Sequence, residues 1–407
     1  MSSNPQLNPR RGERAARFFG LRRNLVLLLA TIVIISTGEE IWMRFLPKYL
    51  QTIGAAVFVI GTFDALRTAI GAVYAYPGGV IVDRFGHRTA LISFTVLSIA
   101  GYALVAVVPH WVAVIGGMFL FLSWTCFSLP AAFSLVAATL AREQHAMGIA
   151  VQSVVKRLPI LVGPIVGGIL IDRYGVVIGV RVGLAISCVC GTIALLVQLG
   201  IREAPRGRIS DRQSFLAIAR RMNAPLRHLL LSDILVRFCE RIPFAWVVIY
   251  AMDNVGVTAT NVGVLTAIEM LIATAALIPT AYFADRYGRE PFIIATFVFF
   301  TLFPITLLWA NSFALLTLAF AVRGLKEFGD SARKALIIGE CPEEVRARMI
   351  GCYYLIRDVI VAFGAFIGAA LWKLGPRVNF SSAALLGAAG TIYYLISRSR
   401  IAFPPQS

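Results

Sequence analysis

The chain has 407 residues, of which 58% are hydrophobic and only 14% are charged. A soluble protein of this length would carry charges on about a quarter of its residues, so the composition excludes an ordinary soluble protein and indicates that lipid covers most of the surface. The formal net charge of +17 is also typical of nucleic-acid-binding proteins. Here, however, the arginines stand in short stretches between long apolar runs, as in the cytoplasmic loops of membrane proteins, and we expect no nucleic-acid partner.

Twelve apolar runs are each long enough to cross a lipid bilayer, which takes about 20 helical residues. In chain order they cover residues 24–46, 57–81, 89–108, 111–138, 146–171, 177–200, 229–252, 259–283, 291–310, 313–338, 348–372 and 379–397. This pattern predicts an all-α membrane protein with twelve transmembrane helices. The first run is too long for the apolar core of a cleavable signal peptide, so we expect it to remain as the first helix.

Lysine and arginine are distributed unevenly between the two ends of these helices. If the amino terminus is placed in the cytoplasm, most lysines and arginines of the loops fall on the cytoplasmic side, and only Lys48, Arg173, Lys373 and Arg377 fall outside. This bias follows the positive-inside rule, and it holds only for an even number of helices. We therefore expect a multi-pass protein of the bacterial inner membrane with both termini in the cytoplasm.

A long connection after the sixth helix divides the chain into two parts. We expect a basic cytoplasmic tail over residues 1–23, a six-helix half over 24–200, a cytoplasmic linker over 201–228, a second six-helix half over 229–397 and a cytoplasmic tail over 398–407. In the linker, apolar residues recur at helical spacing after Ser210-Asp211-Arg212, which is typical of a helix start. They are Phe215, Leu216, Ile218, Ala219 and Met222. This spacing predicts a short amphipathic helix on the inner membrane face, with a disordered basic segment as the alternative.

One short motif recurs in the loops of both halves. The copy between helices 2 and 3 contains Gly79, Asp83, Arg84, Gly86 and Arg88, and the copy between helices 8 and 9 contains Asp285, Arg286, Gly288 and Arg289. A third copy, residues 168–175, ends the fifth helix on the opposite side, and a degraded fourth copy covers residues 372–375. Recurrence at half-chain spacing and on both sides predicts two pseudo-symmetric six-helix halves, each built from inverted three-helix repeats.

The chemistry of this motif suits a tight hairpin between two helices. The aspartate can accept hydrogen bonds at the amino terminus of a neighbouring helix. The last glycine can adopt the positive φ angle that a very short turn requires, and the arginines can anchor the loop to the inner membrane face.

The segment from Gly79 to Arg88 resembles the cytoplasmic loop signature of the major facilitator superfamily, G-x-x-x-D-R-x-G-R-R, with His87 at one basic position. The second copy is weaker, with Ala281 in place of the first glycine. The resemblance covers the whole chain in helix count and loop placement, and residues 38–49, 76–79, 326–334 and 351–354 look like a bacterial subgroup of that superfamily. It implies the superfamily fold and a secondary transporter that works by alternating access.

The fifth helix contains Gly163-Pro164, followed by Gly167-Gly168, which is similar to the G-P-x-x-G-G ending of the drug–proton antiporter branch. Ala150 and Pro159 stand where that motif has glycines upstream. A kinked, closely packed helix explains the same residues without any antiporter function. The motif therefore leaves drug export open as an alternative.

Ionisable side chains inside the predicted helices are the candidates for function, because each costs about 2.5–3.5 kcal/mol to insert at bilayer depth. The third, fourth, ninth and twelfth helices contain none. Arginine suits the bidentate capture of carboxylate or phosphate, so we expect the basic residues to bind an anionic group of the substrate: Arg67, Lys156, Arg157, Arg237, Arg323, Lys326 and Arg357. Structural ion pairs are the competing interpretation, above all for Asp233, Arg333 and Lys334.

The acidic residues in these helices are the candidates for proton coupling, because loss of water favours the uncharged form of a carboxyl group. They are Glu39, Glu40, Asp64, Glu269, Glu327 and Asp358. The prediction is thus a proton-coupled secondary transporter for a small molecule with an anionic group. The alternatives are a multidrug–proton antiporter and, in another class, a transport-inactive sensor or assembly protein on the same fold.

The remaining predictions concern what the chain should lack. The six cysteines are scattered, mostly in apolar runs, and we expect small core residues rather than metal ligands. No catalytic triad or nucleotide-binding loop is visible in the sequence, so we expect neither an enzyme nor a cofactor. The expected partners are a small-molecule substrate, protons and the lipid bilayer, and we expect a monomer.

Overall fold

A computed structural model describes residues 23–139, 155–201, 215–342 and 345–397, and these residues form helices joined by short turns. The tails, the start of the predicted fifth helix and the predicted helix start at Ser210 lie outside the described residues. Seven described segments are long and apolar enough to span a membrane: Arg23–Met43, Arg88–Val107, Val176–Gln198, Ala259–Ala276, Glu290–Trp309, Arg348–Lys373 and Pro376–Ser397. The prediction of an all-α membrane protein is confirmed, and helices lie at all twelve predicted positions.

The first half contains seven described helices. They are α2 (Arg23–Met43), α3 (Leu46–Thr52), α4 (Val57–Phe85), α5 (His87–Val107), α6 (Trp111–Thr139), α8 (Arg157–Tyr174) and α9 (Val176–Gln198). After the short α10 (Phe215–Arg220), the second half contains α11 (Ala224–Arg241), α12 (Trp246–Ile249), η2 (Tyr250–Asn254), α13 (Ala259–Tyr287), α14 (Glu290–Trp309), α15 (Phe313–Leu325), α16 (Asp330–Glu340), α17 (Arg346–Lys373) and α18 (Pro376–Ser397).

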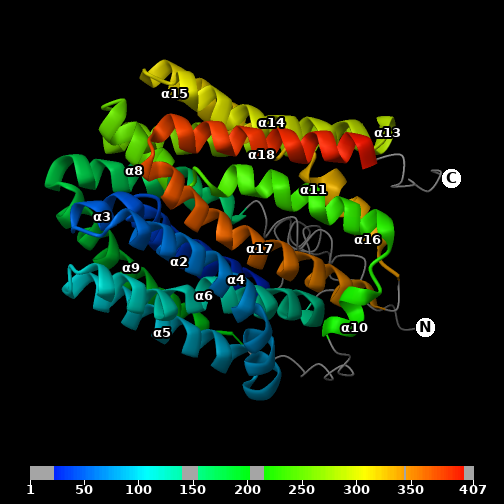
Figure 1. The fold of residues 1–407 in the computed structure, drawn as a ribbon. Helices are drawn as coiled ribbons and strands as arrows, with labels where there is room; N and C mark the ends of the chain where they lie inside the picture. Colours follow the sequence, from blue (N-terminus) through cyan, green and yellow to red (C-terminus); the bar gives the residue numbers. More distant parts are fainter. Residues whose placement is uncertain (1–22, 140–154, 202–214, 343–344, 398–407) are drawn as a thin grey trace, which may run out of the picture.

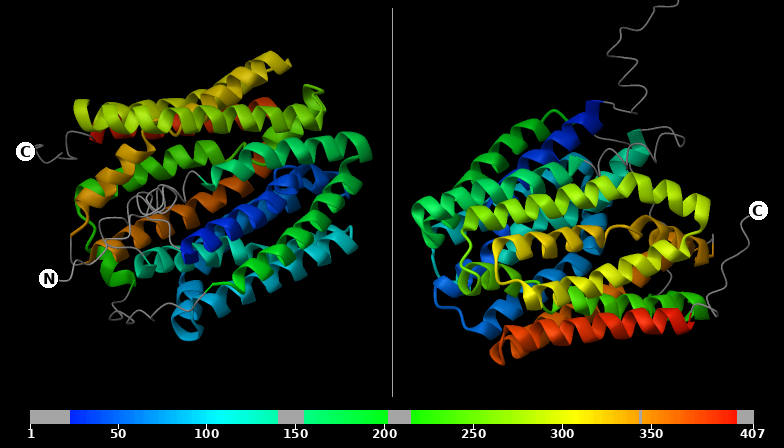
Figure 2. Two further views of the ribbon diagram at one scale, coloured as in Figure 1. Left: turned by 180° about the vertical axis from the view of Figure 1, so that it is seen from behind. Right: turned by 90° about the horizontal axis from the view of Figure 1, so that it is seen from above.

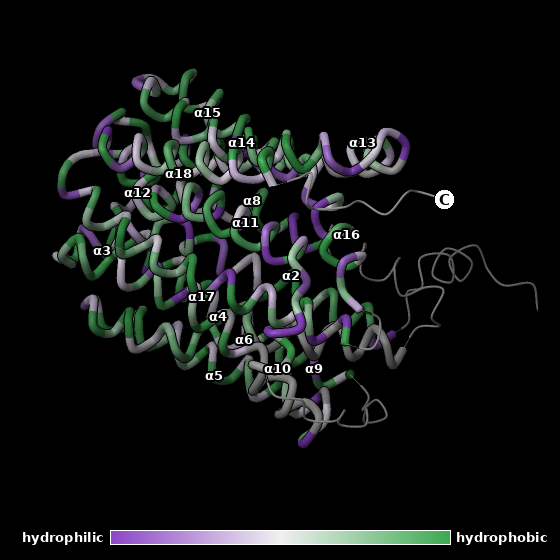
Figure 3. The backbone as a smooth tube through the Cα atoms, turned by 45° about the vertical axis from the view of Figure 1, so that its right-hand side comes forward, coloured by the Kyte–Doolittle hydropathy of each residue, from purple (hydrophilic) through white to green (hydrophobic). Residues whose placement is uncertain are grey.

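The helices run side by side, and the two halves meet along their length (Figure 1). Helices α5, α6 and α9 lie on one flank and α14, α15 and α18 on the other, with α2, α4, α8, α11 and α17 between them (Figures 1 and 2). Across the halves, α8 packs along α13 and α4 packs along α17. Figure 3 shows mostly apolar residues along the flanking helices and polar residues at the ends and within the bundle. The least charged predicted spans are therefore peripheral.

Three predicted spans are interrupted where the sequence indicated continuous helices. The first breaks between α2 and α3, the seventh between α11 and α12, and the tenth between α15 and α16. In the seventh, Pro243 lacks the backbone N–H that would continue the helix. In the tenth, the Gly329 N–H donates to the Thr296 hydroxyl instead of to its own helix. Each break has a charged residue within it or beside it, namely Arg44, Arg241 or Lys326.

The repeated motif places a glycine at each of four equivalent junctions between helices. Gly86, Gly175, Gly288 and Gly375 have φ angles of 88°, 78°, 93° and 120°. A residue with a Cβ rarely adopts this conformation, which lets one helix end and the next begin with almost no loop. The degraded fourth copy, residues 372–375, thus makes the same kind of turn as the other three.

Two of the apolar residues predicted for the linker helix, one in α10 and one just after it, face protein. Ile218 and Met222 are 5% and 4% exposed and belong to one buried cluster with Leu226 of α11 and Met349 of α17. The helical spacing in the sequence predicts that these apolar residues lie on the membrane face. The core of the second half covers them instead, and α11 begins at Ala224, five residues before the predicted start.

Candidate functional site

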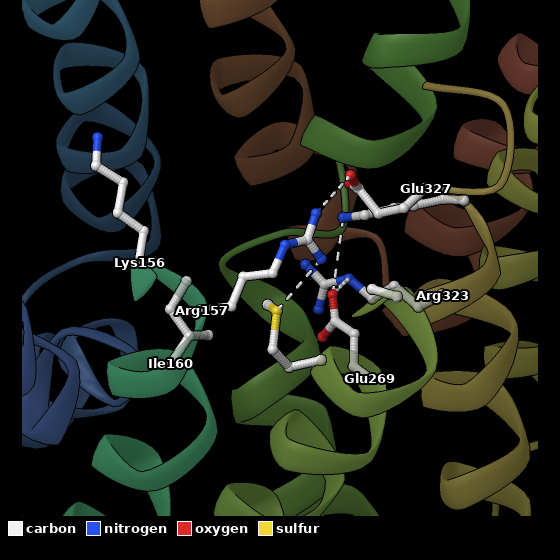
Figure 4. Close-up of a pocket in the computed structure, with 9 residues that line it drawn as sticks. Lys156, Arg157, Ile160, Glu269, Arg323 and Glu327 are labelled. Atoms are coloured by element: carbon white, nitrogen blue, oxygen red, sulfur yellow. Dashed lines mark hydrogen bonds and ion pairs between the residues drawn. The ribbon is translucent and has the colours of Figure 1, made fainter. Parts of the chain in front are cut away.

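A cavity of about 320 Å³ lies where the two halves meet near the middle of the bundle (Figure 4). Helix α8 of the first half and α13, α15 and the α15–α16 break of the second half surround it. Its lining residues are Lys156, Arg157, Ile160, Glu269, Met270, Ala273, Arg323, Lys326 and Glu327. Four basic side chains therefore face two acidic ones, and three apolar side chains complete the wall.

Glu269 is the centre of the ion pairs at this cavity. Its carboxylate lies 3.3 Å from Nη2 of Arg44, 3.2 Å from Nε of Arg323 and 3.7 Å from Nζ of Lys326. Arg44 comes from the break between α2 and α3, so this contact joins the two halves. Three cations, one of them from the first half, therefore surround this one carboxylate.

Arg323, predicted to bind substrate, is enclosed by protein. Its side chain is 3% exposed, and its guanidinium lies over the rings of Phe244, Phe303 and Phe320 at 5.6, 5.0 and 5.9 Å. Cation–π contacts and the ion pair with Glu269 hold it in place. In this arrangement, Arg323 orients Glu269 and presents little surface to a ligand.

Lys156 and Arg157 are the basic residues that the first half contributes to the cavity. Arg157 lies 3.6 Å from Glu327 across the interface between the halves, and its Nη1 lies 3.8 Å from the Met270 sulfur. Among the described residues, Lys156 has no hydrogen-bond or ion-pair partner. Its side chain extends away from the cluster around Glu269 (Figure 4). These two residues are the cavity cations most available to a ligand.

A second network of charges lies within the second half, away from the cavity lining. Asp233 is 1% exposed and pairs with Arg333 at 2.5 Å, with Arg357 at 3.3 Å and with Arg237 at 3.9 Å. The Tyr353 hydroxyl donates to the same carboxylate at 3.3 Å. Arg237 and Arg357, both predicted to bind substrate, are therefore held by a buried aspartate.

Further ion pairs complete this network. Arg237 contacts Glu240 at 2.9 Å, and Glu240 contacts Lys326 at 2.5 Å, which connects the network to the cavity. Asp358 pairs with Arg357 at 2.7 Å. The interpretation as structural ion pairs thus fits Arg237, Arg357 and Asp358 better than a direct role at the cavity.

The acidic residues of the first half have different surroundings. Glu39 is 6% exposed and accepts hydrogen bonds from the Tyr102 hydroxyl at 2.6 Å and from the Thr125 hydroxyl at 2.8 and 3.0 Å. No cation of the described residues forms an ion pair with it. Tyr102 and Thr125 lie in the third and fourth predicted spans, which contain no charged residue, so the charge pattern of the sequence offers no reason to select them.

The other predicted residues of the first half lie near the interface between the halves. Glu40 packs against Gly163, where an added Cβ would lie 2.6 Å from the Glu40 Cβ. Asp64 accepts a hydrogen bond from Arg241 at 3.0 Å, which joins α4 to α11. Neither Glu40 nor Arg67 pairs with an opposite charge in the part of the chain that the structure describes.

The loop-motif residues lie in and between the helix ends that meet at Gly86 and Gly288, and none of them lines the cavity. The guanidinium of Arg84 lies 5.4 Å from the ring centroid of Phe85, and that of Arg286 lies 5.8 Å from that of Tyr287. The side chains of Asp83 and Asp285 lie outside the described set. In the described residues, no group of three His, Cys, Asp or Glu side chains could hold a metal ion.

The sequence profile of the Major Facilitator Superfamily matches residues 28–252 and 229–406. The chain is 21% identical over 400 residues to the multidrug resistance protein MdtG of Serratia proteamaculans (strain 568), covering 93% of this chain and 94% of that protein. It is 22% identical over 388 residues to the class C tetracycline resistance protein of Escherichia coli, covering 90% and 93%.

Two solved structures show the same fold at low sequence identity. A POT family transporter in complex with 5-aminolevulinic acid aligns with a TM-score of 0.80 and 13% identity, covering 95% of this chain and 98% of that chain. A mutant of the nucleoside transporter NupG aligns with a TM-score of 0.74 and 14% identity, covering 93% and 100%.

Proposed function

The chain belongs to the Major Facilitator Superfamily, and we propose that it is a proton-coupled secondary transporter whose substrate carries an anionic group. The cavity between the halves is the single observation that supports this substrate class. Four basic side chains and two acidic ones line it, and Lys156 has no partner among the described residues. A cation away from water needs an opposite charge or strong hydrogen-bond acceptors, and a carboxylate or phosphate supplies both.

The apolar part of the wall indicates what else the substrate contains. Ile160, Met270 and Ala273 face the same cavity as Lys156 and Arg157. Methionine adapts its shape to irregular apolar groups. A small molecule with one anionic end and an apolar body fits this lining better than a uniformly polar one.

For proton coupling, the surroundings of the acidic residues favour Glu39 over Glu269. Glu269 has three cations around it, and its carboxylate is engaged in ion pairs with them. Glu39 is buried, has hydroxyl partners and has no described ion pair, so its acid form is accessible. We therefore propose that Glu39 binds and releases the proton and that Glu269 holds the cavity cations in place.

The experiment that tests the substrate class is a thermal-shift screen of the purified full-length protein, followed by flux in proteoliposomes. Small anionic metabolites, their amide or ester analogues and neutral amphiphiles form three arms. We expect stabilisation by an anion, no stabilisation by its uncharged analogue, and loss of both binding and flux in Lys156→Gln. Stabilisation by the uncharged analogue to the same extent would overturn the proposal.

Export of amphiphilic drugs is the second candidate function. Both named relatives are resistance proteins, and residues 163–168 resemble the antiporter ending of the fifth helix. The neutral amphiphiles of the same screen separate the two candidates. Binding of several unrelated amphiphiles that persists in Lys156→Gln would favour drug export.

A further inference from the structure

The third copy of the loop motif makes a contact between the two halves that the cavity does not involve. Asp172, near the end of α8, accepts hydrogen bonds from the backbone N–H groups of Ala259 and Thr260, both at 2.8 Å. These two residues open α13 in the other half. The first N–H groups of a helix have no acceptor within it, and the helix dipole favours a negative charge there. One carboxylate thus satisfies two donors across the interface.

The backbones of α8 and α13 touch at the same place. A Cβ on Gly168 would lie 2.5 Å from the carbonyl oxygen of Ala259, and a Cβ on Gly263 would lie 2.4 Å from that of Pro164. Both gaps are too small for any side chain. The contact of Asp172 therefore sits at the end of a tight helix crossing and forms only when the two helices are fully closed against each other.

A second polar contact joins the halves at this end of the bundle. Lys48 and Gln51 of α3 both contact the carboxylate of Asp253 in η2, Gln51 at 3.0 Å. Here the acid belongs to the second half, whereas Asp172 belongs to the first. The matching contact between α4 and α17 is apolar, with the rings of Phe58 and Phe366 tilted by 33° and their centroids 5.6 Å apart.

Asp172 is also far from the cavity. It lies fifteen residues after Arg157 on the same helix, which is about 22 Å at 1.5 Å per residue. It can therefore influence transport only through the relative position of the halves. Any movement that parts α8 from α13 at this end breaks both of its hydrogen bonds.

We propose that Asp172 is a latch that holds the end of the bundle opposite the described chain ends in its closed arrangement, by capping α13 of the other half. The purpose of the latch rests on the proposed transport function, but its existence does not. The latch requires only that the closed arrangement of this end be less stable when the carboxylate of Asp172 is removed. Replacing a capping carboxylate shifts such an equilibrium about fivefold.

The test is amide hydrogen exchange, measured by mass spectrometry on the substrate-free, full-length protein in lipid nanodiscs. In Asp172→Ala we expect exchange to accelerate about fivefold in peptides that cover residues 256–262. We expect the same change in residues 46–53 and 250–255, which Asp172 does not touch. Asp172→Asn, which keeps one acceptor oxygen, should give a smaller change of the same pattern.

Two further variants make the result decisive. Gly168→Ala pushes the backbones apart and should accelerate exchange in the same three segments, whereas Arg173→Gln, at an exposed neighbour, should leave them unchanged. If hydrogen exchange accelerates only in residues 256–262, Asp172 acts as a local helix cap. That result would overturn the proposal that it is a latch. Unchanged exchange in Asp172→Ala would overturn it as well. Because no substrate is needed, these outcomes are independent of whether an anion is transported.

Discussion

At the scale of single residues, the structure shows that ionisable side chains which look alike in the sequence have different partners. All are costly at bilayer depth, but their partners differ. Glu269 has three cations, Glu39 has two hydroxyl-bearing neighbours, and Lys156 has no described partner. These partners are the basis on which we propose a structural role for Glu269, proton exchange for Glu39 and ligand binding for Lys156. The nature of the partner, rather than depth in the membrane, therefore assigns the role.

Replacing Glu39 by Gln should uncouple transport from the pH gradient. The amide keeps the shape of the side chain and can still accept from Tyr102 and Thr125, but it cannot bind or release a proton. We expect flux driven by a pH gradient to fall at least tenfold in proteoliposomes, while exchange of labelled for unlabelled substrate persists. Glu269→Gln is the matched control at the other buried carboxylate. Gradient-driven flux that survives in Glu39→Gln but fails in Glu269→Gln would reverse the assignment.

Arg323→Gln should destabilise the protein more than it affects ligand recognition. Removing one partner of a buried ion pair costs about 3–5 kcal/mol, and the three phenylalanine rings would lose the guanidinium between them. Thermal unfolding of the detergent-solubilised protein measures the change. Lys334→Gln is the control, because that side chain is 56% exposed and surface pairs contribute about 0–1 kcal/mol. Equal unfolding temperatures for the two variants would contradict the buried role of Arg323.

At the scale of elements, apolar length and arginine placement were enough to predict where the helices lie, because lipid leaves few other arrangements for the backbone. The four junction turns followed from glycines in a repeated motif. The breaks at Arg44, Pro243 and Lys326 were not predicted, because hydropathy does not distinguish a continuous helix from two pieces joined within the membrane. The burial of Arg323 was missed for a similar reason. It depends on Phe244 in the α11–α12 break and on Phe303 in α14, which are distant from Arg323 in the sequence.

Gly329→Ala should disturb the break between α15 and α16. A Cβ at this position would lie 2.0 Å from the carbonyl oxygen of Phe292, and backbone cannot move aside as a side chain does. Overpacking of this kind costs about 1–3 kcal/mol, measured as a lower unfolding temperature. Gly339→Ala in α16 is the matched control, since nothing lies within 4 Å of its Cβ and alanine favours helix by up to about 1 kcal/mol. A loss of stability in Gly339→Ala equal to that in Gly329→Ala would contradict the packing argument.

At the scale of the whole molecule, the two halves are related by sequence and fold but not by charge chemistry. The second half holds a connected network from Asp233 through Arg237 and Glu240 to Lys326. In the first half, by contrast, Glu39, Arg67 and Lys156 have no ion pair among the described residues. A network of satisfied charges makes a half rigid. We infer that the second half serves as the rigid frame, and that the first half contributes the groups whose charge state or ligand changes during transport.

The orientation of this asymmetric molecule gives the last prediction. The positive-inside bias predicts that the turns at Gly86 and Gly288 lie in the cytoplasm and that α3 lies on the outer face. Single cysteines at Thr52 in α3 and at Arg84 should therefore react differently with a membrane-impermeant maleimide in intact cells. We expect labelling of Thr52→Cys from outside, and of Arg84→Cys only after permeabilisation. The unaltered protein is the control for its six cysteines, four of which are buried. The reverse labelling pattern would show that the protein has the opposite orientation in the membrane. The end of the bundle that Asp172 holds closed would then face the cytoplasm.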